Sequence, residues 1–424
     1  MVRPTARGVG LLLVACATYI AARTLGTWEL YLLSFAFLGA LLVSWLLALL
    51  SGRKLAATRT ATPERPVAGD ALTLSFVVTN RSLLPGLQVT LRQATGDLGA
   101  PDREIHVESL GWRAERVVTT EPLPARRGVH RLPAMLADAG DPLGLMHVRR
   151  RLGEPIELVV YPRLVELPSC ALVADTGRRR ERGRRGLPTL GGSEFRSVRP
   201  HHPGEPLNHV DWKSTAKTGV LMLREMDDTG GGDITLLLDG AAAHVVGEPP
   251  ETSLELAIRA AGSVAGFALR AGRPVTLLLH ENDWRPARLS PDTNGHHRLL
   301  ESLARVTPHT ASQLGRSLKA LLAGVGSAAR TQTLTLVVLA LDRPLVHSLI
   351  ALRHEGLQVS VIHVASASFG SGVSAASAGP TPEDRALLLS LAAARIRCLT
   401  LSRHDDLRAS LSLWRSDDLR AVSR

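Results

Sequence analysis

Two apolar runs near the amino terminus constrain the fold of this chain more than any other feature. Trp28 to Leu50 is an apolar run with one charge, Glu29, at its edge. A run of about 20 apolar residues has the length of a membrane-spanning helix. Gly8 to Ala22 is a second uncharged run, which is short for a span. We therefore predict a transmembrane helical hairpin within residues 1–55.

The charges around these runs predict the topology. Basic residues precede the first run and follow the second, whereas the turn between them holds Arg23 alone. Cytoplasmic segments of membrane proteins are enriched in arginine and lysine, so both ends of the hairpin, and the bulk of the chain, are expected in the cytoplasm. The expected location is the cell membrane, with two helices. A cleaved signal peptide is the alternative for the first run, because a basic start and a short apolar stretch are also typical of signals.

Residues 62–168 have the pattern of a small β domain. Short strand-like runs, such as Leu72 to Thr79 and Ile156 to Tyr161, alternate with turn signals. This pattern is typical of an antiparallel β-sandwich. Two corners stand out, Arg126-Arg127-Gly128 and Asp141-Pro142-Leu143-Gly144-Leu145, and we attribute both to turns set by glycine and proline.

Residues 233–424 change to an alternation of strands and helices. Asp233 to Leu238 and Val275 to His280 have the pattern of buried strands, with a long amphipathic helix between them. Such an alternation predicts a doubly wound α/β domain whose ligands bind at the carboxyl ends of its strands. Asp239 and Asp342 are expected at such ends.

Asp239 and Asp342 are the candidate metal ligands of this domain. Magnesium and calcium prefer a shell of oxygen ligands. Residues 240–243, directly after Asp239, are glycine and alanine and supply no side-chain oxygen, which leaves Thr252 or Ser253 as a further ligand. We therefore expect a degenerate site, with no metal and no other cofactor.

Between the two domains, residues 169–232 form a linker with an unusual stretch, Gly191 to Lys217. The stretch is dense in charge, histidine and proline and has neither a helical nor a strand period, so we interpret it as an ordered functional loop. Only four of the 50 basic residues of the chain are lysines, and Lys213 and Lys217 lie in this stretch. Retained lysines in so arginine-rich a chain indicate a need for a compact ammonium group.

The mixed charges of this stretch favour a docking surface for a protein over nucleic-acid binding, which needs one sign of charge. The stretch either binds a partner or joins the two domains through salt bridges. Phe195 and Trp212 are its apolar anchors, and Trp212 is expected in the core. The net charge of +11 does not change this interpretation, because no nucleic-acid motif accompanies it.

The sequence gives little support for catalysis. It contains no phosphate-binding loop and no nucleophile elbow. A hydrolase that uses His201, His209 and Asp211 is the weakest alternative. The three cysteines are too far apart to indicate a disulfide framework or a zinc site. We predict that the protein is not an enzyme.

The central stretch also resembles the signature of a bacterial family, the domain of unknown function 58 family. The shared pattern is G-x-E-F-x-x-x-R, then P-G-[DE], then [DH]-W-[KR]-x-[ST]-A-[KR]. The residues that carry it, and that we take as a partner-binding or interdomain site, are Glu194, Phe195, Arg199, Gly204, Glu205, Asp211, Trp212, Lys213 and Lys217. The corners Arg127-Gly128 and Asp141 to Leu145 match the family as well.

This resemblance implies a membrane-anchored protein with a β-sandwich and a von Willebrand factor type A-like domain. It also implies association with a MoxR-type AAA+ ATPase and other membrane proteins, in a chaperone-like or cell-envelope role without an established activity. We therefore expect a non-enzymatic adaptor or scaffold. The metal motif of type A domains is reduced here to Asp239-Gly240-Ala241-Ala242-Ala243, and a metal-dependent ligand-binding type A module is the alternative.

Overall fold

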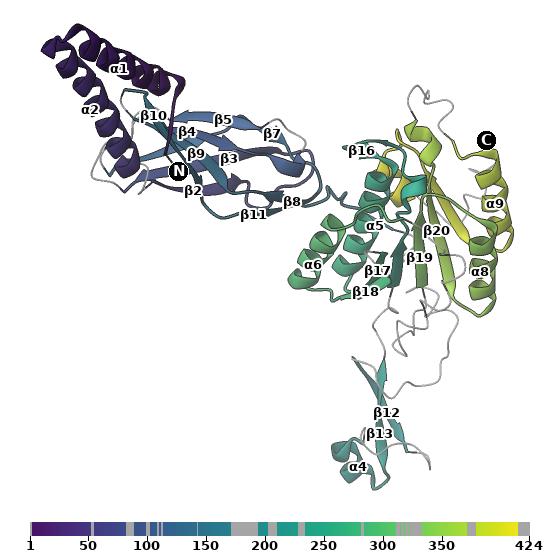
Figure 1. Cartoon of the computed structure of the whole chain (residues 1–424). Coiled ribbons are helices and arrows are strands. Elements are labelled where there is room, and N and C mark those ends of the chain that lie inside the picture. The colour runs from purple at the N-terminus through teal and green to yellow at the C-terminus, as the bar shows by residue number, and fades with distance from the viewer. Residues whose placement is uncertain are drawn as a thin grey trace. The chain divides into compact units, whose positions relative to one another are not determined.

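A computed structural model gives the fold of the chain in two compact units, Met1–Tyr161 and Pro162–Arg424, which are described separately (Figure 1). The structure describes residues 2–51, 55–81, 89–98, 102–107, 110–111, 113–141, 143–170, 194–201, 210–227, 234–280, 284–310, 314, 318, 322, 333–370 and 379–413. The domain bounds given above remain predictions.

Unit 1 begins with two apolar helices, as predicted. Helix α1 (Ala6–Leu25) starts at Thr5, whose hydroxyl accepts a hydrogen bond from the Gly8 N–H, and ends at Gly26 with φ of 69°. Helix α2 (Trp28–Ser51) follows directly and packs against α1. The buried Ser34 hydroxyl donates to the Ala15 carbonyl across the pair at 2.8 Å. Both helices are long and apolar enough to cross a membrane.

The described strands of unit 1 form two antiparallel sheets and one separate antiparallel pair. One sheet has the order β1 (Val2–Pro4), β10 (Met146–Leu152), β9 (Met135–Gly140), β4 (Val89–Gln93) and β5 (Arg103–Val107). The other has the order β2 (Leu55–Thr62), β3 (Ala71–Asn80) and β6 (Glu115–Thr119), with β7 (Leu123–Pro124) paired to β3. Strands β8 (Gly128–Leu132) and β11 (Ile156–Val160) pair with each other, and a short 3-10 helix η2 spans Gly96–Leu98.

The core of unit 1 follows from the two-residue period of its strands. In β3 every second side chain, from Leu72 to Val78, is fully buried, because successive side chains of a strand point to opposite faces. These side chains share one apolar cluster with residues of β4 and β9, such as Leu91 and Met135. The strands of both sheets therefore enclose a single core.

Unit 2 is built on a six-stranded sheet. Its order is β18 (Trp284–Leu289), β17 (Val275–His280), β14 (Ile234–Leu238), β19 (Thr333–Val338), β20 (Gln358–Val364) and β21 (Arg397–Leu401). All neighbours are parallel except the edge strand β18, which is antiparallel to β17. All five residues of β14 are buried, as expected for a parallel strand with both faces covered.

Helices cover both faces of this sheet. They are α5 (Ser253–Arg270), α6 (Thr293–Ala304), α8 (Arg343–His354), α9 (Pro382–Ala393) and α10 (Leu407–Leu413). Helices α5, α6 and α10 share a core with Leu236, whereas α8 and α9 share one with Leu237, which points to the opposite face (Figure 1). Helices α5 and α6 approach closely at Gly262, where a Cβ atom would collide with Leu164 and Leu303.

Short elements complete the described part of unit 2. They are the 3-10 helices η4 (Ala242–His244) and η5 (Ser366–Phe369), the paired strands β15 (Gly247–Glu248) and β16 (Glu251–Thr252), and β12 (Glu194–Pro200), β13 (Met222–Asp227) and α4 (Trp212–Thr218) of the central stretch.

Candidate functional site

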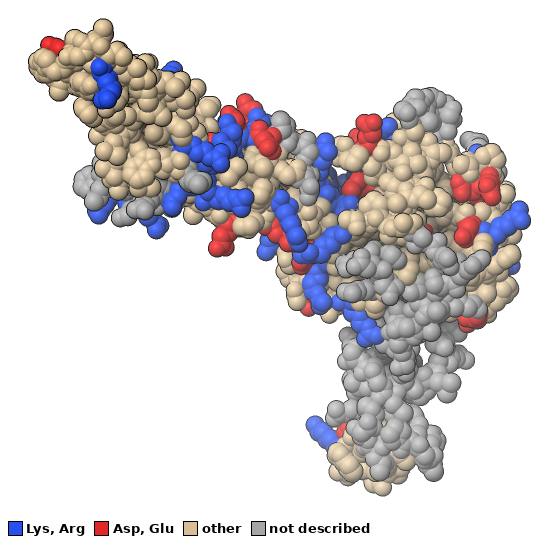
Figure 2. Space-filling model, viewed as in Figure 1, with Lys and Arg blue, Asp and Glu red and all other residues tan. Residues whose placement is uncertain are grey.

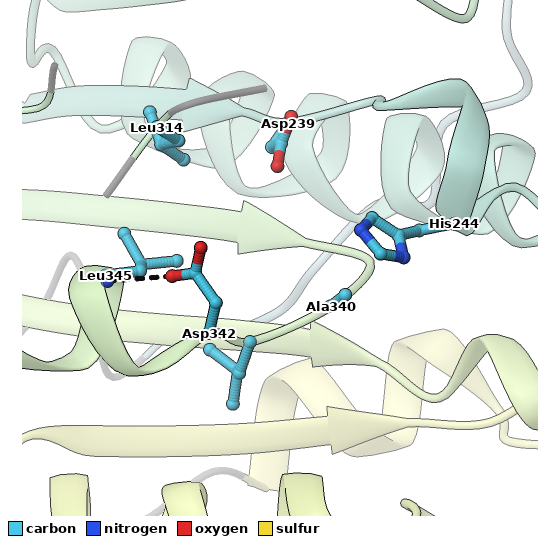
Figure 3. A pocket seen from close by; sticks show the side chains of 7 residues that line it. Asp239, His244, Leu314, Ala340, Asp342 and Leu345 are labelled. Carbon is cyan, nitrogen blue, oxygen red and sulfur yellow. Dashed lines mark hydrogen bonds between the residues drawn. The ribbon is translucent and has the colours of Figure 1, made fainter. Parts of the chain in front are cut away.

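A small pocket of about 90 Å³ lies where strands β14 and β19 end (Figure 3). The carboxyl ends of parallel strands meet at one edge of a sheet, and this brings Asp239 and Asp342 to the same pocket although 103 positions separate them. The lining residues are Asp239, His244, Leu314, Ala340, Leu341, Asp342 and Leu345. The sequence thus placed both aspartates at the correct edge.

Asp342 has a local structural role in this pocket. Its Oδ1 atom accepts a hydrogen bond of 2.8 Å from the Leu345 N–H, which caps helix α8 (Figure 3). A carboxylate at this position satisfies a backbone donor that the first turn of a helix leaves without a partner. One of its two oxygens is therefore already engaged.

Asp239 is paired with a histidine that the sequence did not reveal. Its Oδ1 lies 3.2 Å from Nε2 of His309, and both side chains are almost fully buried. The His309 backbone is bonded to the chain after β14, since its carbonyl accepts from the Ala242 N–H at 2.8 Å. The same Nε2 atom accepts a hydrogen bond of 3.2 Å from the Gly240 N–H, so this imidazole, 70 positions from Asp239, contacts both the carboxylate and the backbone after β14. No local pattern marks that histidine.

The donors of this pocket do not fit a hard divalent cation. Magnesium and calcium need several oxygen ligands, but Asp342 is partly committed and Asp239 faces an imidazole. The hydroxyls considered as further ligands serve the backbone instead: Thr252 accepts from the Glu255 N–H and Ser253 from the Val246 N–H. Among the described residues, no group of three or more His, Cys, Asp or Glu side chains is placed to hold a metal ion.

The central stretch forms regular structure where it is described, so the interpretation as a loop without helix or strand was wrong there. Strand β12 pairs antiparallel with β13, from Glu194 opposite Asp227 to Pro200 opposite Met222. The register shifts between Phe195 and Ser197, and such a bulge disturbs the alternation by which strands are recognised. Of the signature residues, Gly204 and Glu205 lie outside the described part of the chain.

Helix α4 is short but capped at both ends. The buried Asp211 is its N-cap, and Oδ1 of this residue accepts a 3.0 Å hydrogen bond from the Ser214 N–H. Gly219 ends the helix with φ of 71°. The Thr215 hydroxyl accepts from the Met222 N–H at 2.9 Å and so ties the helix to β13. An aspartate N-cap and a glycine after the last turn are sequence signals of a helix, and they could have predicted α4.

The expectation that Trp212 lies in the core was wrong, because 69% of this residue is exposed. Helix α4 has only seven residues and none of them is buried. Its caps fix Trp212 at the first helical position, where no described residue covers the indole. Lys213 and Lys217, four residues apart and hence on one face of the helix, are exposed as well. The helix therefore presents an aromatic ring and two ammonium groups to solvent.

The hydrolase alternative receives no geometric support from the residues that are described. Asp211 is committed to its cap, and the backbone N–H of His201 donates to the Leu221 carbonyl. His209 lies outside the described residues. The absence of enzymatic activity remains a prediction.

Solved structures similar to part of this chain include a VWA domain and a conserved hypothetical protein. The SpRpn10 VWA domain is 11% identical, with a TM-score of 0.30, and the match covers 42% of this chain and 92% of that domain. The conserved hypothetical protein BatB from Bacteroides thetaiotaomicron is 12% identical, with a TM-score of 0.31 and coverage of 45% and 98%.

The sequence comparisons match parts of this chain to one family and to one curated relative. The family model described as Protein of unknown function DUF58 matches residues 197–381, and this confirms the predicted family resemblance. The uncharacterized protein YeaD of Bacillus subtilis (strain 168) is 25% identical over 245 residues, which cover 54% of this chain. The chain matches 58% of the length of that relative.

Proposed function

We propose that the protein is a membrane-anchored, non-enzymatic adaptor that binds a partner protein through helix α4. The two apolar helices would anchor it, and the flanking charges favour a cytoplasmic location for the rest of the chain. The single core shared by two groups of strands supports a β-sandwich, and the parallel sheet with helices on both faces supports a doubly wound, type A-like domain.

The observation that carries this proposal is the exposed Trp212 on a rigidly capped element. An indole that is 69% exposed leaves a large apolar surface in water. Tryptophan is among the residues that most often dominate the free energy of binding at protein interfaces. Two exposed lysines on the same short helix add a positive charge that favours an acidic partner surface.

The family resemblance indicates the partner class. We expect a MoxR-type AAA+ ATPase, because the domain of unknown function 58 family is associated with such ATPases. An adaptor needs a presented surface and no catalytic group. The pocket at Asp239 is compatible with this role, since the described contacts there, a helix cap and a buried carboxylate-imidazole pair, stabilise the fold.

A crosslinking pull-down from native membranes tests the proposal. The test variant replaces Trp212, Lys213 and Lys217 with alanine. The matched control replaces Leu389, which is 50% exposed, and the exposed Arg385, both on α9, with alanine. Circular dichroism and melting temperatures first establish that both variants fold. We expect wild type and control to capture an ATPase and the α4 variant to lose it.

Equal capture by all three proteins would overturn the assignment of α4 as the docking surface. Capture by none of them would overturn the adaptor proposal for this partner class. Either result would move the search to the carboxyl ends of the strands around Asp239.

A further inference from the structure

The corner from Asp141 to Leu145 is more than a turn set by glycine and proline. The Asp141 carboxylate accepts two backbone hydrogen bonds, from Leu143 N at 3.1 Å and from Met146 N at 2.7 Å. Gly144 has φ of 66°, a conformation that favours glycine. The corner is therefore held from within by a buried carboxylate, yet its apolar residue Leu143 is 56% exposed.

This corner is bonded to the first turn of α1. The Thr5 N–H donates to the Leu145 carbonyl at 2.9 Å, and the Thr5 hydroxyl donates to the Gly144 carbonyl at 2.7 Å. Gly8 packs directly on the Leu145 carbonyl, where a Cβ atom would collide with the oxygen. Strand β1 extends the attachment by pairing with β10, from Val2 opposite Val148 to Pro4 opposite Met146. The start of the helix and the corner thus form one rigid piece.

The attachment fixes the depth of Leu143 if α1 crosses a membrane. The uncharged run of α1 starts at Gly8, less than one turn after the Thr5 contact. One helical turn rises about 5.4 Å, and the polar layer on each side of the hydrocarbon core is roughly 5–8 Å thick. The corner therefore lies at the level of the lipid headgroups. An exposed leucine at that level can bury its side chain in lipid.

Basic side chains accompany the corner. Arg3 and Arg7 are exposed, and the guanidinium of Arg7 is 3.8 Å from the position of a Cβ atom built on Gly144. Figure 2 shows a hairpin surface that is almost uncharged, with basic side chains gathered over the strands beside it. Guanidinium groups pair well with phosphate oxygens. An apolar tip next to arginines is the composition of a segment that binds a membrane interface.

We propose that the Asp141–Leu145 corner is a membrane-interface contact of unit 1, in which Leu143 enters the bilayer surface and Arg3 and Arg7 bind phospholipid phosphates. This inference rests on the membrane anchoring proposed above. The contact holds the β-strands of unit 1 against the bilayer instead of leaving them on a free tether. It also gives the Asp141 carboxylate a function, which is to hold the corner in the conformation that exposes Leu143.

Fluorescence quenching by spin-labelled lipids tests the contact in the full-length protein, reconstituted in phosphatidylcholine nanodiscs. Three sites carry an environment-sensitive thiol probe, one per sample: the native Cys16 of α1, Leu143→Cys, and Val117→Cys, the last two with Cys16→Ala. Val117 on β6 is the matched control, because it is apolar and 60% exposed. It pairs with Val77 of β3, three residues from Asn80, and Asn80 pairs with Leu55 at the start of β2. Val117 therefore lies farther along the sheet from the membrane helices than Leu55 does. Cys170 is buried and Cys398 is half-buried, so both are replaced with alanine in every sample to exclude background labelling.

We expect strong quenching and a blue-shifted emission at positions 16 and 143, and neither at position 117. Quenching at position 16 without quenching at 143 would overturn the interface contact and leave the membrane anchor intact. Absence of quenching at position 16 would overturn the anchor itself, and with it this inference. Equal quenching at 143 and 117 would show that lipid proximity is not specific to the corner, which also overturns the proposal.

Discussion

At the scale of single residues, the buried His363 links the stability of unit 2 to pH. It lies on β20 with no exposed surface, and within the described part of the chain neither ring nitrogen has a hydrogen-bond partner. Burial lowers the pKa of His363, and the carboxylate of Asp384, 3.8 Å away, opposes that shift only in part. The folded protein therefore binds this proton less readily than the unfolded chain, so stability falls as pH drops below about 6.5.

We predict that His363→Gln flattens this dependence. In wild type the free energy of unfolding should decrease on acidification, with a contribution from His363 of up to about 1.4 kcal/mol per pH unit. Denaturant melts at pH 7.5 and 5.5 measure it. The control is His347→Gln on α8, because His347 is exposed. A variant that loses as much stability as wild type between these pH values would contradict the assignment to His363.

The residues of the candidate sites show what local patterns can reveal. Asp239 and Asp342 were placed at the correct edge of the sheet, because an apolar run followed by a carboxylate is visible in the sequence. His309 was not, since only the folded chain brings it to Asp239. Trp212 was misplaced because an aromatic residue is usually buried. Helix α4, however, has only seven residues and buries none of them, and no described residue covers the indole.

At the scale of elements, buried strands and capped helices were the most predictable. Strand β17 has the predicted bounds. The sequence pattern also predicts a helix from Pro382 to Arg395, and α9 begins at Pro382. Strand β18 was missed because it is an antiparallel edge strand that contains Pro286 and two arginines, a composition that central strands avoid. The sequence pattern also predicts a helix from Ser312 to Val325, which lies mostly outside the described residues.

Helix α4 depends on its N-cap more than a longer helix would. Seven residues are too few for a helix that is stable by itself, so the Asp211 hydrogen bond to Ser214 carries much of its order. We predict that Asp211→Ala destabilises the helix by about 1 kcal/mol, whereas Asp211→Asn, which keeps an acceptor oxygen, costs much less. Hydrogen exchange of the amides of residues 214–218 measures the difference. Amide exchange in Asp211→Ala as slow as in wild type would show that the cap is dispensable.

At the scale of the whole molecule, each unit has its own apolar core. The core of unit 1 joins strands of both its sheets, and the two clusters of unit 2 lie on opposite faces of the six-stranded sheet. In the sequence, short strands separated by turns give way to strands that alternate with helices. This change predicted two domains of different architecture. The pairing of β1 with β10 was not predictable, because a three-residue strand before a membrane helix has no recognisable pattern.

Units with separate cores are expected to unfold in separate transitions, and Arg59 offers a way to assign them. This half-buried side chain of β2 donates to Gln93 Oε1 at 2.6 Å and to the carbonyls of Pro133, Leu132 and Glu154 at 3.0, 3.1 and 3.4 Å. It thereby ties β2 to strand β4 of the other sheet. Burial lowers the pKa of Arg59, but the guanidinium stays charged at neutral pH.

We therefore predict that Arg59→Met lowers the melting temperature of one calorimetric transition of the full-length protein in detergent and leaves the other unchanged. The lost hydrogen bonds should cost unit 1 roughly 2 kcal/mol, since the four acceptors lose a charged donor. Arg116→Met, at an exposed position of β6, is the control and should shift neither transition. His363→Gln should move only the transition that Arg59→Met leaves in place. A single transition that both substitutions shift would mean that the two cores unfold together and would contradict their independence.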